Sequence, residues 1–255
     1  MKKYAVITGA SSGIGLEFAK QLADKGYALV LTARAEDRLK KVAESLPTEC
    51  EIIIADLEQE EDCFRFFEQV KEKNIELFIN NAGFGDCGRF AETELTKELA
   101  MIQVNVKAMH ILMKLMLQKM KLQGSGYLLN IASSAGLMAA GPYMATYYAT
   151  KAYVASMTQA VAVELKQEKS PIYVGCLCPG PVNTGFNKVA NVEFALKEIS
   201  PEECVRYAVK KMFARKVVIV PTMIMKLAVF ACHISPRAIS TRITAGQQKR
   251  KFRSG

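Results

Sequence analysis

Histidine is scarce in this chain, which has only His110 and His233 among its 255 residues. A zinc site combines several His or Cys ligands at short spacings, so the sequence predicts no metal site. The seven Cys residues are odd in number and show no paired spacing typical of a disulfide framework. Cys176 and Cys178 lie two residues apart on an expected strand, but no second pair accompanies them. This usage of cysteine indicates a reducing compartment.

Linkers, low-complexity tracts and internal repeats are also missing from the sequence. A chain that is 50% hydrophobic and 23% charged is expected to bury a sizeable core. One domain over residues 1–255 is therefore the favoured organisation. The start, Met-Lys-Lys, imitates the basic end of a signal peptide, but Gly9 and Gly15 interrupt the apolar run too early. We therefore expect a cytoplasmic protein.

The apolar run at residues 217–234 contains Pro221 and Lys226. A transmembrane helix needs about 20 clean apolar residues. The run therefore predicts a last buried strand at residues 217–220, followed by a C-terminal amphipathic helix.

The net charge of +9 points weakly to an anionic ligand or surface. Part of it lies in Lys249, Arg250, Lys251 and Arg253, which we expect to be the frayed end of a basic C-terminal tail (residues 236–255). No recognised motif supports binding to nucleic acid, so none is expected. Contact of the last helix and the tail with a membrane surface stays open as a less favoured alternative.

A glycine-rich turn follows the first expected strand, residues 4–8, and precedes a helical pattern that runs to residue 25. In this setting glycines let the backbone approach a pyrophosphate, and the helix N-terminus offers free N–H groups. The sequence therefore predicts a nucleotide site at this turn, with the serines adding hydroxyl donors. Its expected contacts are Gly9, Ser11, Ser12, Gly13, Ile14 and Gly15.

The second expected strand, residues 28–32, ends before Ala33-Arg34, with Arg38 one turn further on. An acidic residue at this place would bind the ribose hydroxyls of NAD, whereas Arg can grip a 2′-phosphate with two hydrogen bonds. The sequence therefore favours NADP(H) over NAD(H). The alternative is that both arginines are merely exposed.

Two further strands, residues 51–55 and 76–79, end in short polar or small-residue segments. The first segment is expected to edge the adenine, and the small residues of the second would let the backbone lie against a cofactor. The residues concerned are Asp56 and Leu57 in the first segment, and Asn81, Ala82 and Gly83 in the second.

Tyr147 and Lys151 lie four residues apart in a predicted helix, so both are expected on one face. A cation close to a phenol favours the phenolate and would lower the Tyr pKa from roughly 10 toward neutrality. The pair therefore predicts a general acid–base group. A second pair with the same spacing, Tyr207 and Lys211, is interpreted as a solvated helix face.

The long helical stretch at residues 94–122 carries a methionine stripe that is expected in the core or at a subunit interface. The stripe consists of Met109, Met113, Met116 and Met120. Asn105 lies among apolar neighbours, so it is either a structural hydrogen-bond partner or part of a proton relay.

Ser133 and Ser134 follow the fifth expected strand, residues 126–132, where open α/β sheets bind ligands. A serine at this edge can donate a hydrogen bond to a substrate carbonyl. Beyond the sixth expected strand, residues 171–178, the chain continues as Pro179-Gly180-Pro-Val182-Asn-Thr184.

Taken in order, these motifs resemble the short-chain dehydrogenase/reductase family over about residues 3–185. The resemblance implies a doubly wound parallel sheet of about seven strands flanked by helices, a Rossmann fold with a C-terminal helical extension. It also implies a catalytic tetrad of Asn105, Ser133, Tyr147 and Lys151. Lys151 would bind the nicotinamide ribose, and Pro179, Gly180, Val182 and Thr184 would complete the cofactor site. The spacing to Tyr147 leaves Ser134 as an alternative to Ser133.

The family resemblance implies reversible hydride transfer between NADP(H) and a small-molecule carbonyl or alcohol, in a homo-oligomer that is a dimer or a tetramer. Residues 183–215 are expected to form a substrate lid and helix. The apolar residues expected near the substrate are Tyr143, Met144, Phe186, Val189, Val192, Phe194 and Leu196. They suggest a steroid, acyl or other apolar ketone, although the lid can equally bury its own side chains. A non-catalytic NADP(H)-binding sensor or scaffold is the alternative function.

Overall fold

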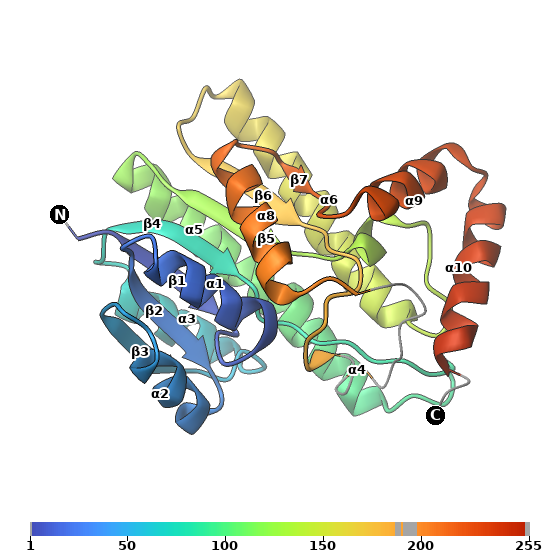
Figure 1. The fold of residues 1–255 in the computed structure, drawn as a ribbon, viewed down its shortest axis with the longest axis horizontal. Coiled ribbons are helices and arrows are strands. Elements are labelled where there is room, and N and C mark those ends of the chain that lie inside the picture. The colour runs from blue at the N-terminus through green and yellow to red at the C-terminus, as the bar shows by residue number, and fades with distance from the viewer. Residues whose placement is uncertain (1, 187–189, 191–197, 253–255) are drawn as a thin grey trace.

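The computed structural model of this chain describes residues 2–186, 190 and 198–252. Its centre is a sheet of seven parallel strands in the order β3-β2-β1-β4-β5-β6-β7 (Figure 1). The strands are β1 Tyr4–Thr8, β2 Ala28–Ala33, β3 Cys50–Ile54, β4 Ile75–Asn80, β5 Tyr127–Ile131, β6 Tyr173–Leu177 and β7 Val218–Ile219. The predicted doubly wound fold is thereby confirmed. The strand order reverses between β1 and β4, which is where such sheets bind ligands.

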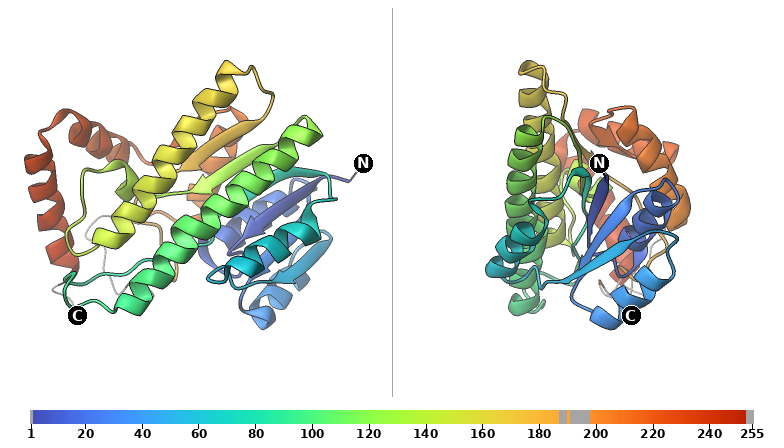
Figure 2. Two further views of the ribbon diagram at one scale, coloured as in Figure 1. Left: turned by 180° about the vertical axis from the view of Figure 1, so that it is seen from behind. Right: turned by 90° about the vertical axis from the view of Figure 1, so that its left-hand side faces the viewer.

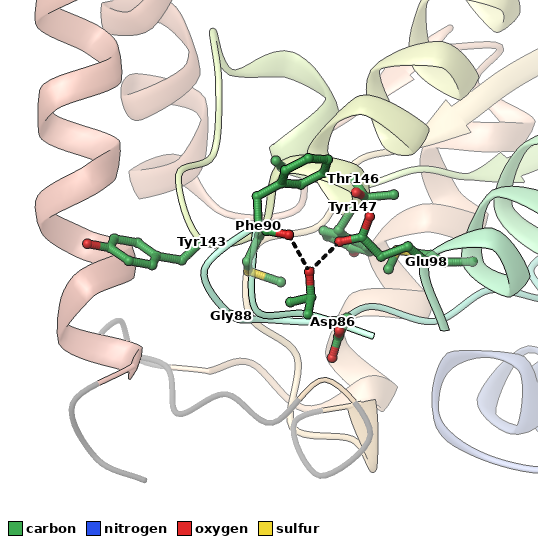
Figure 3. Close-up of a pocket in the computed structure, with 11 residues that line it drawn as sticks. Asp86, Gly88, Phe90, Glu98, Tyr143, Thr146 and Tyr147 are labelled. Atoms are coloured by element: carbon green, nitrogen blue, oxygen red, sulfur yellow. Dashed lines mark hydrogen bonds between the residues drawn. The ribbon is translucent and has the colours of Figure 1, made fainter. Parts of the chain in front are cut away.

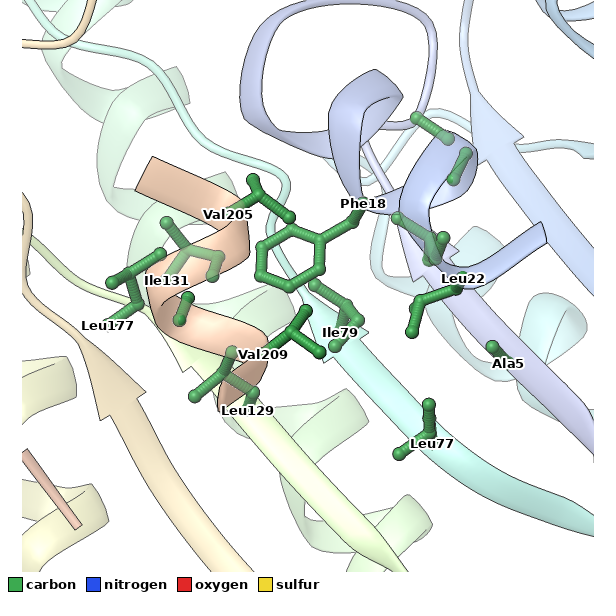
Figure 4. Packing of buried hydrophobic residues seen from close by; sticks show 14 of the residues in the cluster. Ala5, Phe18, Leu22, Leu77, Ile79, Leu129, Ile131, Leu177, Val205 and Val209 are labelled. Carbon is green, nitrogen blue, oxygen red and sulfur yellow. The ribbon is translucent and has the colours of Figure 1, made fainter. Parts of the chain in front are cut away.

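Helices cover both faces of the sheet, as the side view in Figure 2 shows. The first face carries α1 Gly13–Ala23, α2 Glu36–Glu44 and α8 Pro201–Phe213. The second carries α3 Glu60–Val70, α5 Met109–Gln123 and part of α6 Ala145–Gln167. Side chains of β1 alternate between the two cores, because successive residues of a strand point to opposite faces. Phe18 of α1 packs between the sheet and Val205 and Val209 of α8 (Figure 4).

The predicted long helix is α4 Leu95–Ile102, a π-helical segment Gln103–Ala108, and α5 in direct succession. It is long and apolar enough to cross a membrane, and among the described helices no other meets both criteria. The methionine stripe of α5 is nevertheless buried against the sheet, so these residues belong to the core. This outcome confirms the core alternative and shows why length and apolarity alone do not identify a membrane span.

The C-terminal segment contains α9 Met223–Ile234 and α10 Arg237–Phe252. The short strand β7 and α9 confirm the prediction for residues 217–234. The frayed end expected at Lys249, Arg250 and Lys251 is wrong, because these residues lie in the helix α10; Arg253 lies outside the described residues. Ser240, Thr244 and Gln248 recur every four residues on its buried side, and the Gln248 amide donates to the Tyr148 hydroxyl at 2.6 Å. This inward-facing polar stripe was not predicted, because the basic residues are the more conspicuous feature of this segment of the sequence.

Candidate active site

The glycine-rich turn joins the C-terminal end of β1 to α1. Gly9 and Gly13 have φ angles of +65° and +56°, which lie in the left-handed region that favours glycine. A Cβ on Gly15 would lie 2.3 Å from the Gly9 carbonyl oxygen, so no other side chain fits there. Ser12 precedes α1 without capping it through its side chain, so the first N–H groups of the helix are left for another acceptor. The turn is thus shaped for an anion at a helix N-terminus.

We expect Gly15→Ala to weaken NADPH binding at least about tenfold and to lower the free energy of unfolding by about 1–3 kcal/mol. The new methyl group would also lie 2.5 Å from the Asn81 side-chain nitrogen, so the turn must deform. Thermal unfolding and fluorescence titration with NADPH measure the two effects. Gly246→Ala is the matched control, because nothing lies within 4 Å of its Cβ position. If Gly15→Ala lost no more NADPH affinity and no more stability than Gly246→Ala, the turn would tolerate a side chain at residue 15.

The segment from Asn81 to Gly85 connects this turn to the helix that carries Tyr147. The Thr8 hydroxyl accepts hydrogen bonds from the backbone N–H groups of Asn81 and Ala82, both at 2.9 Å. The Asn81 side chain donates to the carbonyls of Thr8 and Gly9. A Cβ on Gly83 would lie 3.3 Å from Lys151 Nζ, and one on Gly85 would lie 3.2 Å from the Tyr147 ring. Five consecutive residues therefore run from the predicted phosphate site to the predicted catalytic pair.

Arg34 directly follows β2 and lies beside the polar turn that follows β3. Its guanidinium forms an ion pair with Glu58 at 2.8 Å, and its side chain is 64% exposed. Asp56 accepts a hydrogen bond from the Glu58 backbone N–H at 3.1 Å, while Leu57 is buried. Arg34 is therefore exposed, as the alternative interpretation required, but it already has a carboxylate partner that the sequence analysis did not identify.

Tyr147 and Lys151 lie one turn apart on α6, as expected, and both are buried, with exposed fractions of 8% and 4%. Lys151 Nζ is 5.9 Å from the centre of the Tyr147 ring. The amine donates a hydrogen bond to the Ile131 carbonyl at 2.9 Å. Lys151 thus connects α6 to the end of β5.

The predicted lowering of the Tyr147 pKa is wrong as far as the groups of the protein itself are concerned. Burial raises the pKa of Tyr147 to about 12, and a hydrogen bond with Ser133 opposes this only in part. Burial also lowers the pKa of Lys151 to about 8. The physical reason is the same in both cases, because a charged form loses hydration when it leaves water. For Tyr147 this loss of hydration outweighs the effect expected from the neighbouring cation.

Ser133, rather than Ser134, is the serine that meets Tyr147. Its side chain is hydrogen-bonded to the Tyr147 hydroxyl and also accepts from the Ala135 backbone N–H at 3.1 Å. Ser134 is buried, and its backbone N–H donates to the Pro179 carbonyl at 2.8 Å. The extra residue before Tyr147 is therefore accommodated in the loop after Ser133.

Asn105 lies in the π-helical segment and is fully buried. Its side-chain oxygen accepts from the Phe84 N–H at 3.0 Å, and its amide donates to the Phe84 carbonyl and the Thr150 hydroxyl. These bonds give it the structural role that the sequence analysis named first. They also fix the 81–85 segment against α6. The proton-relay role remains a proposal.

Three more predicted contacts, Gly180, Val182 and Thr184, follow β6, and Thr184 lies against the glycine-rich turn. A Cβ on Gly13 would lie 3.3 Å from Thr184 Cβ, and the Thr184 hydroxyl accepts from the Phe186 N–H at 3.2 Å. Val182 is buried and bridges to Ile199. Gly180 packs against Met225 of α9, which leaves no room for a side chain. The strand-end segment therefore spans from α9 to the predicted phosphate site.

An apolar cluster surrounds the Tyr147 ring. Phe186 lies with its ring centre 5.4 Å from that of Tyr147, and Tyr143 and Met144 belong to the same cluster, as expected. Tyr143 has a φ of +66°, a strained value for a residue other than glycine. The expected lid residues Val189, Val192, Phe194 and Leu196 lie outside the described residues.

Residues 86–101 line one side of a pocket at Tyr147, and this contribution was not predicted from the sequence. A pocket at Tyr147 is lined there by Asp86, Phe90, Glu98 and Met101 (Figure 3). The Thr93 hydroxyl donates to Glu98 at 2.6 Å and so holds this carboxylate in place. The available signal was the long connection after β4, because loops at the carboxyl ends of parallel strands build ligand sites.

Comparisons with known proteins agree with this arrangement. Residues 3–193 match the family model described as short chain dehydrogenase. An uncharacterized oxidoreductase of Staphylococcus saprophyticus is 34% identical, over 81% of this chain and 89% of that protein. A very-long-chain 3-oxoacyl-CoA reductase of Anas platyrhynchos is 31% identical, over 81% of this chain and 67% of that protein.

Solved structures show the same fold. A short-chain dehydrogenase from Sphingobium yanoikuyae in complex with NADPH has a TM-score of 0.79 and 29% identity, covering 88% of this chain and 89% of its own. A short-chain dehydrogenase/reductase from Burkholderia phymatum in complex with NAD has a TM-score of 0.83 at 24% identity, covering 91% and 93%. The second likeness supports the fold alone.

Proposed function

The chain belongs to the short-chain dehydrogenase family, and we propose that it interconverts a carbonyl and a secondary alcohol with NADP(H). The observation that carries this proposal is the buried Tyr147, whose hydroxyl is hydrogen-bonded to Ser133 and which lies one helical turn before the buried Lys151. Family membership makes the chain an oxidoreductase with a nicotinamide cofactor. The roles of individual residues are our proposal.

The residues present fit a dinucleotide, because the turn at Gly9 to Gly15 excludes side chains where a pyrophosphate would lie. Arg34 would hold the 2′-phosphate, and Asp56 and Leu57 would border the adenine. Lys151 would hold the nicotinamide ribose, and Val182 and Thr184 the carboxamide. When bound, the nicotinamide ring supplies or accepts the hydride.

Ser133 and Tyr147 would act together on the substrate oxygen. Ser133 would hold the carbonyl, and the Tyr147 hydroxyl would deliver a proton to that oxygen as the alcohol forms. Burial raises the pKa of Tyr147 to about 12, so at neutral pH the hydroxyl carries the proton that this step needs.

The substrate is proposed to be an apolar ketone, such as an acyl chain or a steroid. Support comes from the apolar cluster of Phe186, Tyr143 and Met144 around Tyr147. The names of several relatives, which are very-long-chain 3-oxoacyl-CoA reductases, agree with an acyl substrate. A homo-oligomer and a cytoplasmic location stay part of the proposal.

Oxidation of NADPH and NADH with ketosteroids, 3-oxoacyl thioesters, quinones and small ketones tests the proposed function. We expect NADPH to be oxidised with at least one apolar ketone. Tight cofactor binding without oxidation by any of these compounds would contradict it and favour a nucleotide sensor or scaffold.

We expect Arg34→Ala to weaken NADPH binding about 10–100-fold and to leave NADH binding nearly unchanged, because only NADPH carries the 2′-phosphate. Glu58→Gln removes the competing carboxylate and should tighten NADPH binding severalfold. Fluorescence titration with both cofactors measures these effects. Arg206→Ala is the control, because Arg206 is also exposed and paired with a glutamate, Glu202, but on α8. Equal losses for NADH and NADPH would refute the assignment of Arg34.

A further inference from the structure

Charge is divided unequally along this chain. All 25 Asp and Glu residues lie within residues 1–203, where they outnumber Lys and Arg. Residues 204–255 contain no acidic residue and carry twelve basic ones. The net charge of +9 therefore arises entirely from the C-terminal fifth of the sequence. These residues are Arg206, Lys210, Lys211, Arg215, Lys216, Lys226, Arg237, Arg242, Lys249, Arg250, Lys251 and Arg253.

One face of α9 is apolar and exposed. Its large side chains are between 63% and 69% exposed, and at 100° per residue they fall on one side of the helix. The opposite side holds α9 to the body through Met225, which is 4% exposed and packs against Gly180. Lys226 donates to the Tyr207 hydroxyl at 2.9 Å. The exposed face consists of Met223, Ile224, Leu227, Phe230 and Ile234.

The next helix, α10, also exposes both basic and apolar side chains. Ile239 and Ile243 are 50% and 58% exposed, and Arg237, Arg242 and Lys249 are exposed as well. Figures 1 and 2 show α9 and α10 as an arm at one end of the molecule, beyond the β7 edge of the sheet. Large apolar side chains that are exposed together on one helix face, as on α9, are typical of an interaction site.

We propose that the α9–α10 arm docks on an anionic lipid surface. The apolar face of α9 would enter the boundary between headgroups and acyl chains, while the basic residues of α10 would meet lipid phosphates. With its 12 residues, α9 is too short to span a bilayer, so the contact is peripheral.

The charge distribution favours a membrane over a second copy of this chain. A two-fold interface places the same patch of both subunits together. The basic residues of both arms, including Arg237 and Arg242, would then share one interface, and residues 204–255 offer no Asp or Glu to neutralise them. A surface of anionic headgroups neutralises all of these charges at once.

Cosedimentation with vesicles tests the docking proposal. We expect the full chain to bind phosphatidylcholine–phosphatidylglycerol vesicles, to bind pure phosphatidylcholine much less, and to be released by high salt. Leu227→Glu with Phe230→Glu, and separately Arg237→Glu with Arg242→Glu, should each lower the partition coefficient about tenfold or more. Leu122→Glu and Lys114→Glu on α5 are the matched controls, since both residues are exposed far from the arm in sequence.

Circular dichroism and NADPH binding show whether each variant is folded. Absence of vesicle binding by the unaltered chain would overturn the proposal, as would equal binding by arm and control variants. Analytical ultracentrifugation tests whether this face instead binds a second copy of the chain. If the parent does not bind vesicles and the double variant Leu227→Glu with Phe230→Glu has a lower oligomer mass, the face is a subunit interface. That result would also overturn membrane docking.

Discussion

Replacement of Tyr147 by Phe is expected to lower kcat/KM for carbonyl reduction by about 10²–10⁴-fold. The variant loses only the hydroxyl, which is buried and hydrogen-bonded to Ser133. The aromatic ring still packs against Phe186 and beside Gly85, so the site keeps its shape. NADPH affinity should therefore change little, because the glycine turn and Arg34 are untouched.

The neighbouring residue offers a close control for this prediction. Tyr148 is also buried, and burial likewise raises its pKa to about 12, but its hydroxyl is bonded to Gln248 of α10. Tyr148→Phe should retain most of the activity. Steady-state kinetics and NADPH titration of both variants separate a chemical effect from a binding effect. Turnover of Tyr147→Phe close to that of the parent would remove the proposed acid from the mechanism.

Replacement of Lys151 by Met is expected to stabilise the protein near pH 7 while it impairs turnover. Burial lowers the pKa of Lys151 from 10.5 to about 8, which corresponds to about 3 kcal/mol of lost stability at pH 7. Loss of the hydrogen bond to the Ile131 carbonyl offsets part of the gain. The net increase in the free energy of unfolding should be about 1–3 kcal/mol.

The pH dependence of this difference has a definite sign. Between pH 8 and 10.5 the unfolded chain holds a proton at Lys151 that the folded protein has released. Stability of the parent protein therefore rises with pH across this window through Lys151, and the Met variant lacks that rise. The advantage of the variant should thus shrink as the pH increases from 7 to 10.

Denaturant unfolding of both proteins at pH 7, 8, 9 and 10 measures this difference. Buried tyrosines with a raised pKa, such as Tyr147, lower stability only above about pH 10, and they do so in both proteins. Lys166→Met on the same helix is the control, because Lys166 is exposed and should show no such trend. If the difference in the free energy of unfolding between the two proteins stayed constant from pH 7 to 10, burial would not lower the pKa of Lys151.

Stretches that are encoded locally were predictable from the sequence. The strand, glycine turn and helix from Tyr4 to Ala23 follow from apolar periodicity and from backbone angles that favour glycine. Tyr147 and Lys151 share a face because helical spacing alone places them there. The alternation of β1 side chains between two cores likewise follows from strand geometry.

Features that depend on distant segments could not be obtained in this way. Glu58 meets Arg34 because β3 lies beside β2, and Gln248 meets Tyr148 because α10 returns to α6. The choice of Ser133 over Ser134 depends on how the loop after β5 packs on α6.

The sequence by itself determined which groups lie at the proposed nucleotide and carbonyl sites. The tertiary structure alone decided their protonation, since Tyr147 and Lys151 are shielded from water by residues far away in the chain. The physical reason is that helix and turn geometry are set by neighbouring residues, whereas hydration and charge pairing are set by whatever the fold packs around each group.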